Sequence, residues 1–128
     1  MKQLTVEQFE LCLQYLNLIS GIEEGFEYIT ASFSDFSKTE GDIILSDILE
    51  ALTMIAQTNM ILGPLFIEDE SIQQTIRNFQ NVINAAFQLE GHFDEYDKMV
   101  KVVSNFLLPT FSNWKVSARN SLSGYIVQ

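Results

Sequence analysis

The chain has 128 residues, of which 47% are hydrophobic and 19% are charged, and its net charge is −10. A sequence of this length and hydrophobicity can bury its own core, which excludes a disordered chain and predicts a single helical domain over residues 1–128. Proteins that bind nucleic acids or anionic membranes rely on basic residues, so the acidic charge argues against both kinds of partner.

The first 36 residues carry apolar side chains every three or four positions, which is the period of an amphipathic helix. This apolar stripe consists of Phe9, Cys12, Leu16, Ile19, Ile22, Phe26, Ile29, Phe33 and Phe36. Thr5 and Gln8 have the spacing of a capping box, with Leu4 placed to pack against the first turn. Residues 37–41 then break the pattern. We therefore predict one long helix from Thr5 to Phe36.

The second stripe runs from Ile44 to Leu62, and Thr39 and Asp42 before it are suited to a helix start. Gly63-Pro64 is expected to end this helix. Glycine accepts the left-handed conformation that follows many helices, and proline cannot continue the backbone hydrogen bonds.

The third run begins with three acids at 68–70, which suit the positive end of a helix dipole. Its apolar positions are Ile72, Ile76, Phe79, Ile83 and Phe87. The run is expected to end near Gly91. The apolar rhythm also continues through Gly91, so one continuous helix from about 70 to 108 is an alternative.

The fourth run contains Pro109, where the helix either kinks or gives way to a new helix. Its apolar positions are Phe93, Tyr96, Val100, Val103, Leu107, Phe111, Trp114, Ala118, Leu122 and Tyr125. The first and last helices are thus long, the middle two are shorter, and the connections are short. We predict an all-α, up-down-up-down four-helix bundle whose last helix is kinked or broken at Pro109. The alternative is three long helices followed by a short C-terminal helix.

The charges are unevenly distributed along the chain. Residues 1–97 hold all 17 acidic residues and three of the seven basic ones, for a net charge of −14, whereas residues 98–128 carry +4.

The frequent Ile, Asn, Phe and Lys, with scarce Ala and Arg, are typical of an AT-rich genome and favour a bacterial or phage origin.

The sequence contains no motif for catalysis, a cofactor or a metal. Cys12 is the single cysteine, so no intramolecular disulfide or cysteine zinc site can form, and its place on the apolar stripe predicts an inert, buried thiol. His92 is the single histidine, and Leu89 stands where a di-iron Glu-x-x-His motif needs glutamate. We expect His92 to lie at a helix junction, and we expect no enzymatic activity, no cofactor and no bound metal.

The acidic residues most suited to contact a basic partner are Glu23, Glu24, Glu27, Glu68, Asp69 and Glu70. Acids like these more often form a solvated face, and a cation site at Glu23 and Glu27 is the less favoured interpretation. Lys115 and Arg119 are expected to pair with acids of neighbouring helices. Gly21 and Gly25 indicate either a local bend, which we favour, or the close approach of another helix.

Several apolar residues lie outside the main stripes, namely Leu11, Leu13, Leu18, Ile43, Ile61, Leu65, Phe66, Ile67 and Leu108. A contiguous exposed surplus of this kind marks a partner or self-association surface. Our first hypothesis is therefore a cytoplasmic, non-enzymatic interaction or regulatory protein, such as an inhibitor, immunity-like protein, adaptor or chaperone, with a basic protein partner or a homodimer. The alternatives are a small-ligand or metal-binding bundle and, with less support, an acidic nucleic-acid mimic.

Overall fold

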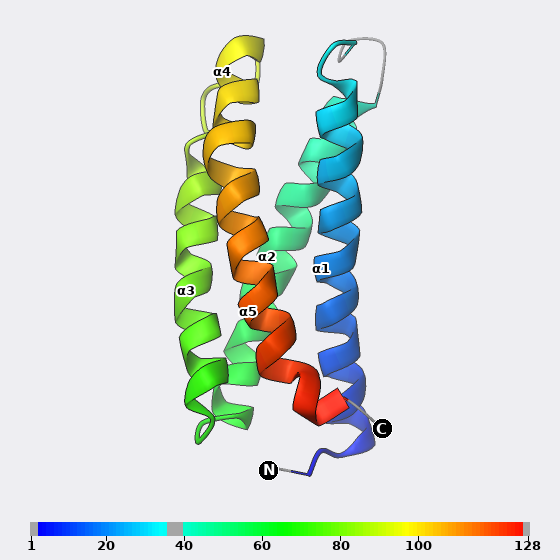
Figure 1. The fold of residues 1–128 in the computed structure, drawn as a ribbon, viewed down its shortest axis with the longest axis vertical. Helices are drawn as coiled ribbons and strands as arrows, with labels where there is room; N and C mark the ends of the chain where they lie inside the picture. The colour runs from blue at the N-terminus through cyan, green and yellow to red at the C-terminus, as the bar shows by residue number, and fades with distance from the viewer. Residues whose placement is uncertain (1–2, 36–39, 127–128) are drawn as a thin grey trace.

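The computed structural model describes residues 3–35 and 40–126 and shows a bundle of long helices (Figure 1). The elements are α1 (Val6–Ser32), α2 (Gly41–Leu65), α3 (Glu70–Phe87), α4 (Tyr96–Val102), the π-helical turn η2 (Val103–Leu107) and α5 (Leu108–Ile126). Because α4, η2 and α5 follow one another without a gap, they form one long fourth helix. Successive helices run in opposite directions, which confirms the predicted all-α, up-down-up-down bundle. Phe36 and Thr39, two predicted helix-boundary residues, lie outside the described residues.

Side-chain caps fix the starts of α1 and α3. The Thr5 hydroxyl accepts a hydrogen bond from the Gln8 backbone N–H at 3.1 Å, and the Thr5 N–H donates to the Gln8 side chain at 3.0 Å. The Asp69 carboxylate accepts from the Ile72 N–H at 3.1 Å, with Glu70 in the first turn of α3. Both starts therefore agree with the sequence signals, because each satisfies backbone donors that a helix leaves unpaired.

The ends of α2 and α3 correct two expectations. α2 passes through Gly63 and Pro64 before it ends, and the Gln73 side chain donates to the carbonyl oxygens of Gly63 (2.9 Å) and Phe66 (2.7 Å). These bonds give partners to carbonyl groups at the end of α2, and α2 therefore extends past Gly63, where the sequence predicted its end. α3 stops before Gly91, whose φ of 81° is left-handed, so the alternative of one helix from 70 to 108 is wrong.

Pro109 does not break the fourth helix. The π-helical turn immediately precedes it, and the Leu108 N–H donates to the Val103 carbonyl instead of following the α-helical pattern. Three α-helical turns hold about 11 residues, whereas Met99 and Phe111 are 12 positions apart. The wider turn takes up the extra residue, so that Met99, Val103, Leu107 and Phe111 all remain buried on the core side.

The core follows the predicted apolar stripes in most places. Buried positions on α1 are Cys12, Tyr15, Ile19, Ile22, Phe26 and Ile29, and those on α2 are Leu45, Ile48, Leu52, Ile55, Asn59 and Leu62. Their alternating steps of three and four are the spacing of helices that coil around each other. The stripe was wrong at Phe87, Phe93 and Tyr96, which are 64%, 54% and 39% exposed. The chain turns away from the bundle between α3 and α4, and Leu89 fills the last core position.

Two buried hydrogen bonds cross the middle of the core. The Tyr15 hydroxyl on α1 donates to the Asn59 side-chain oxygen on α2 at 2.7 Å. The Trp114 indole N–H on α5 donates to the Thr75 carbonyl on α3 at 2.9 Å. The Tyr15 and Trp114 rings meet edge to face, with centroids 6.2 Å apart. All four helices therefore contribute to one layer, in which the polar groups have partners.

A partly buried ion pair joins α1 to α5. Glu23 pairs with Lys115 and also with Arg119, whose Nη2 lies 3.2 Å from Glu23 Oε1. Hydrogen bonds from Arg119 and then Lys115 lower the pKa of Glu23 from about 4.5 to about 2. This confirms the expected role of Lys115 and Arg119 as partners of acids on a neighbouring helix.

Replacing Tyr15 with phenylalanine should lower the free energy of unfolding by about 1–3 kcal/mol, because Asn59 then loses its partner in a buried site. The double variant Tyr15→Phe/Asn59→Leu should be more stable than Tyr15→Phe, since no polar group is left unpaired. Urea denaturation measures both. Tyr28→Phe is the control, because the Tyr28 hydroxyl is exposed and accepts from the Glu40 N–H at 3.2 Å in a site open to solvent. Equal losses at Tyr15 and Tyr28 would contradict the role of the buried bond.

Replacing Glu23 with glutamine should remove part of the acid sensitivity of the fold. Because the pKa of Glu23 is lowered in the folded state, its ion pairs stabilise the protein above about pH 4.5 and this stabilisation is lost as the pH falls towards about 2. We expect Glu23→Gln to cost about 1 kcal/mol at pH 7 and about half as much at pH 3. Thermal unfolding across this pH range measures the difference, and a constant cost at every pH would rule out the ion pairs as its source.

Candidate functional site

A mostly apolar groove lies between α1 and α2. It has a volume of about 750 Å³ and is open to solvent. Its walls are Gln14, Asn17, Leu18, Gly21, Ile22, Glu24, Gly25 and Tyr28 on α1, and Ile44, Asp47, Ile48, Ala51, Met54 and Thr58 on α2. We call this feature the α1–α2 groove. The groove forms because each of the two helices packs one side against the core, while the adjoining outer sides of α1 and α2 remain open to solvent.

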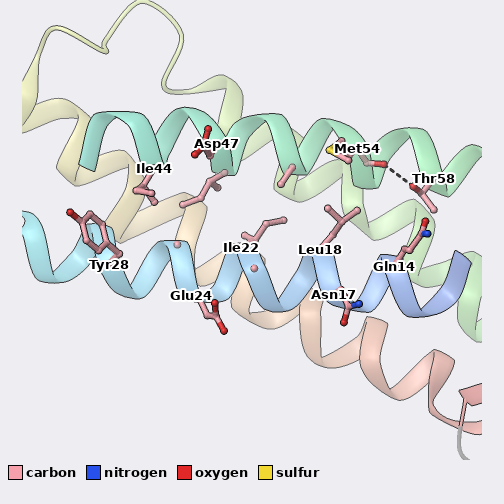
Figure 2. A pocket seen from close by; sticks show the side chains of 14 residues that line it. Gln14, Asn17, Leu18, Ile22, Glu24, Tyr28, Ile44, Asp47, Met54 and Thr58 are labelled. Atoms are coloured by element: carbon pink, nitrogen blue, oxygen red, sulfur yellow. Dashed lines mark hydrogen bonds between the residues drawn. The ribbon is translucent and has the colours of Figure 1, made fainter. Parts of the chain in front are cut away.

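The α1–α2 groove has an apolar floor and acidic edges. Figure 2 shows Leu18, Ile22 and Ile44 pointing into the space between the two helices. Glu24 and Asp47 lie on its two opposite edges, one on each helix. No Lys or Arg is among its lining residues. The groove therefore offers apolar contact in its centre and negative charge on both sides.

The two glycines in the groove have different surroundings. A β-carbon on Gly25 would lie 2.9 Å from Ile48 Cγ1, so this glycine allows α2 to approach α1 closely. A β-carbon on Gly21 would meet nothing within 4 Å. The close-approach interpretation therefore holds for Gly25, whereas no contact within the described residues accounts for Gly21, which weakens the helix by roughly 0.5–1 kcal/mol relative to alanine.

α2 is unusually apolar for a helix that is only partly covered. It is the one helix among the described residues that is long and apolar enough to cross a membrane by length and composition alone, and 28% of its apolar window is buried. Asp47 and Glu50 lie in its middle, which favours a soluble bundle over a membrane span. Its outward side exposes Met54 (45%), Ile61 (56%) and Ile43 (55%). Of the apolar residues outside the stripes, Ile43, Ile61 and Ile67 are exposed on or just after this helix, whereas Phe66 is buried in the core.

The bundle is electrostatically divided between its two halves. α1 carries five acidic residues and α2 three, and neither contains a Lys or Arg. All five basic residues of the described part lie on α3, α4 and α5, namely Arg77, Lys98, Lys101, Lys115 and Arg119. The polarity seen along the sequence is therefore also a polarity in space, with the groove on the acidic half.

The six acids predicted as partner contacts are not brought together. Glu24 lines the α1–α2 groove, whereas Glu23 is engaged with α5 and Glu27 lines a smaller pocket of about 420 Å³ between α1 and α5. The other three lie together at the connection between α2 and α3. There Asp69 caps α3 and accepts from the Tyr125 hydroxyl, which raises the pKa of Tyr125 to about 12. Glu70 pairs with Arg77, and Glu68 is exposed.

Sequence reasoning missed most of the groove on the α2 side, including Asp47, Ala51 and Met54. The sequence signal for the groove was the set of apolar residues outside the main stripes. One of these residues, Leu18, lines the groove. Spacing alone identifies the side of a helix that faces the core, but it does not tell which of the two flanks meets which neighbour.

The groups capable of catalysis or metal binding are placed as the sequence indicated. Cys12 is fully buried, and burial raises the pKa of its thiol. His92 lies in the turn before α4, with Nδ1 3.2 Å from a carboxylate oxygen of Glu95. Across residues 3–35 and 40–126, no three His, Cys, Asp or Glu side chains gather into a cluster that would hold a metal ion.

Alanine substitutions at the two glycines should have opposite effects. Gly21→Ala should raise the free energy of unfolding by about 0.5–1 kcal/mol, because the added methyl group favours the helix and meets no neighbour. Gly25→Ala should lower it by about 1 kcal/mol or more, because the methyl group is forced against the buried Ile48 side chain. Chemical denaturation measures both. A loss of stability at Gly21 would mean that its surroundings are more crowded than the structure indicates.

Comparison with known proteins gives a family but no activity. The chain is 27% identical over 131 residues to the "Uncharacterized protein YvzG" of Bacillus subtilis (strain 168), covering 96% of this chain and 98% of that protein. No solved structure matches the chain. The family described as "Domain of unknown function (DUF8042)" matches residues 10–117, which include the whole α1–α2 groove. The chain therefore belongs to the family of the domain of unknown function DUF8042.

Proposed function

We propose that the protein is a non-enzymatic interaction protein that binds a basic partner protein with the acidic α1–α2 face, in the cytoplasm. The observation that carries this proposal is the α1–α2 groove, in which an apolar floor lies between the acidic edges Glu24 and Asp47. An apolar centre with a polar rim is the usual organisation of a protein interface. The regulatory roles that fit are those of an inhibitor, an adaptor or a chaperone.

The charge distribution supports a basic partner. Eight carboxylates on two adjacent helices, with no internal cation on either helix, create a negative field on one half of the bundle. Such a field accelerates the approach of a positively charged partner and disfavours acidic ones. The same field repels nucleic acid and anionic lipid. Among the acids, Glu24 and Asp47 are placed to contact the partner directly.

A small apolar ligand is the second candidate occupant, and one observation favours it. The groove volume of about 750 Å³ falls within the usual range of small-molecule sites. The groove is open along its length, however, and so would leave much of a small molecule in water. Native mass spectrometry of the purified protein separates the two ideas, because a tightly held ligand adds a defined mass to the chain.

Site-specific photo-crosslinking in the producing cells tests the proposal. A photoreactive phenylalanine at Met54 should give a crosslinked adduct with a protein that has a basic segment at the point of attachment. The same residue at Val116, which is 55% exposed on the opposite half of the bundle, is the control and should give none. The double variant Glu24→Gln/Asp47→Asn should reduce the Met54 adduct several-fold. The absence of an adduct at Met54, or equal adducts at both positions, would count against the α1–α2 face.

A further inference from the structure

We infer that the α1–α2 groove accepts a single amphipathic α-helix of the partner protein, about four turns long, with Lys or Arg along both sides of its apolar face. This inference rests on the proposed function and specifies the shape and chemistry of the partner. It is carried by the dimensions of the groove, by the open space at Gly21 and by the positions of Glu24 and Asp47.

The two walls of the groove set the length of the bound helix. Residues that line it run from Gln14 to Tyr28 on α1 and from Ile44 to Thr58 on α2. Each wall therefore covers 14 helical steps, which is about 21 Å at about 1.5 Å per residue. A helix that lies along the groove would contact it over the same distance, or about four turns, and would become a fifth helix packed on the outside of the bundle.

A helix fits this surface better than an extended peptide does. Peptides that bind as strands need a sheet edge with free backbone groups, and the walls of the groove are helices whose backbone groups bond internally. Proline-rich peptides bind grooves lined with aromatic rings, and Tyr28 is the one aromatic residue among the lining residues. An amphipathic helix needs only an apolar trough, which the partly exposed Leu18, Ile44 and Met54 supply.

Gly21 marks the place where the bound helix comes closest. It lies halfway along the α1 wall, and nothing within the described residues occupies the space where a β-carbon would be. Gly25, one turn away, is explained by its close contact with Ile48. Gly21 also lowers the stability of α1, but no contact within the described residues makes up for this loss. A large apolar side chain of the partner can lie directly against the exposed backbone at this position.

The acidic edges determine the charge of the partner helix. Glu24 and Asp47 belong to different helices and lie on opposite sides of the floor. Neither forms an ion pair within the part of the chain that the structure describes. A helix whose leucine-like side chains face the floor would place residues three or four positions away over these edges, so Lys or Arg at those positions would meet a carboxylate on each side.

Two other occupants fit less well. A second copy of the chain would have to insert its basic α4–α5 region into the groove, and such a head-to-tail contact builds a ring or a filament instead of a simple dimer. A membrane surface would meet the apolar residues of α2, but its anionic lipids would be repelled by the eight acids of α1 and α2. We therefore commit to a helix from another protein.

The test is a nuclear magnetic resonance titration of the full-length ¹⁵N-labelled protein with a synthetic peptide. The probe is an acetylated Leu/Lys/Ala peptide of about 16 residues with leucines at i, i+3, i+4 and i+7, and the control peptide has the same composition with Leu and Lys alternating. The amide signals of Gly21 and Gly25 should shift and saturate at one peptide per chain. Those of Gly91 and Gly124, which lie outside the groove, should not. Circular dichroism should show that the peptide becomes helical when it binds.

Matched variants connect the binding to the groove. Gly21→Leu should weaken peptide binding at least tenfold while the fold remains as stable as the wild type, because its β-carbon meets no neighbour within 4 Å and the rest of the side chain can extend into the open groove. Ser117→Leu adds the same side chain to the exposed surface of α5 and should leave binding unchanged. Glu24→Gln/Asp47→Asn should weaken binding about fivefold, whereas Glu68→Gln/Asp94→Asn, which removes the same charge elsewhere, should have less than a twofold effect.

Several results would overturn the inference. It fails if the helical peptide does not shift Gly21 and Gly25, if the alternating peptide binds equally well, or if Gly21→Leu binds like the wild type. It also fails if wild-type protein instead self-associates in sedimentation velocity through a contact that Gly21→Leu abolishes, or sediments with phosphatidylglycerol vesicles. A crosslink at Met54 together with a failed titration would leave the proposed function standing and remove only the helical partner. Loss of the Met54 crosslink would remove both.

Discussion

The close packing of α1 against α2 is the contact on which the rest of the structure depends. It joins two helices that carry acidic residues and no basic ones, and like charges on neighbouring helices repel each other. The apolar seam offsets this repulsion, and Gly25 allows the seam to close onto Ile48. Lys115 and Arg119 on α5 form ion pairs with Glu23 on the side of α1 that meets the other half of the bundle. Of the remaining acids of α1 and α2, Glu24 and Asp47 line the groove.

The polar layer in the middle of the core determines how the four helices are arranged. Apolar side chains alone pack in many registers, whereas the Tyr15–Asn59 bond and the Trp114–Thr75 bond are satisfied in one. The first bond fixes α1 relative to α2, and the second fixes α5 relative to α3. A bundle with a fixed core can keep an exposed apolar groove open, because the helices that form its walls are already held in place from the inside.

Much of the fold was predictable from the sequence, and the reasons for the remaining errors are physical. The period of three and four identified the four helices, and the Thr5–Gln8 cap and the acids before α3 marked two of their starts. The same period failed at Phe87 and Phe93, because it continues through a turn where the chain leaves the core. The groove was not predictable, because it depends on how α2 packs beside α1. Gly21 and Gly25 have similar neighbours in the sequence, yet α2 contacts Gly25 and leaves the space at Gly21 open. The partner contacts at Glu23, Glu24, Glu27, Glu68, Asp69 and Glu70 remain predictions.

The π-helical turn before Pro109 has a consequence for how the length of this chain can vary. The π-helical segment Val103–Leu107 contains one residue more than a regular α-helix would need between the core positions Met99 and Phe111. Removing one residue there would return the helix to its ordinary pitch, and the side chains on either side would still face the same neighbours. Insertions and deletions are usually confined to loops. In this bundle, one long helix also contains a site where a relative can differ in length by a residue and keep the same core.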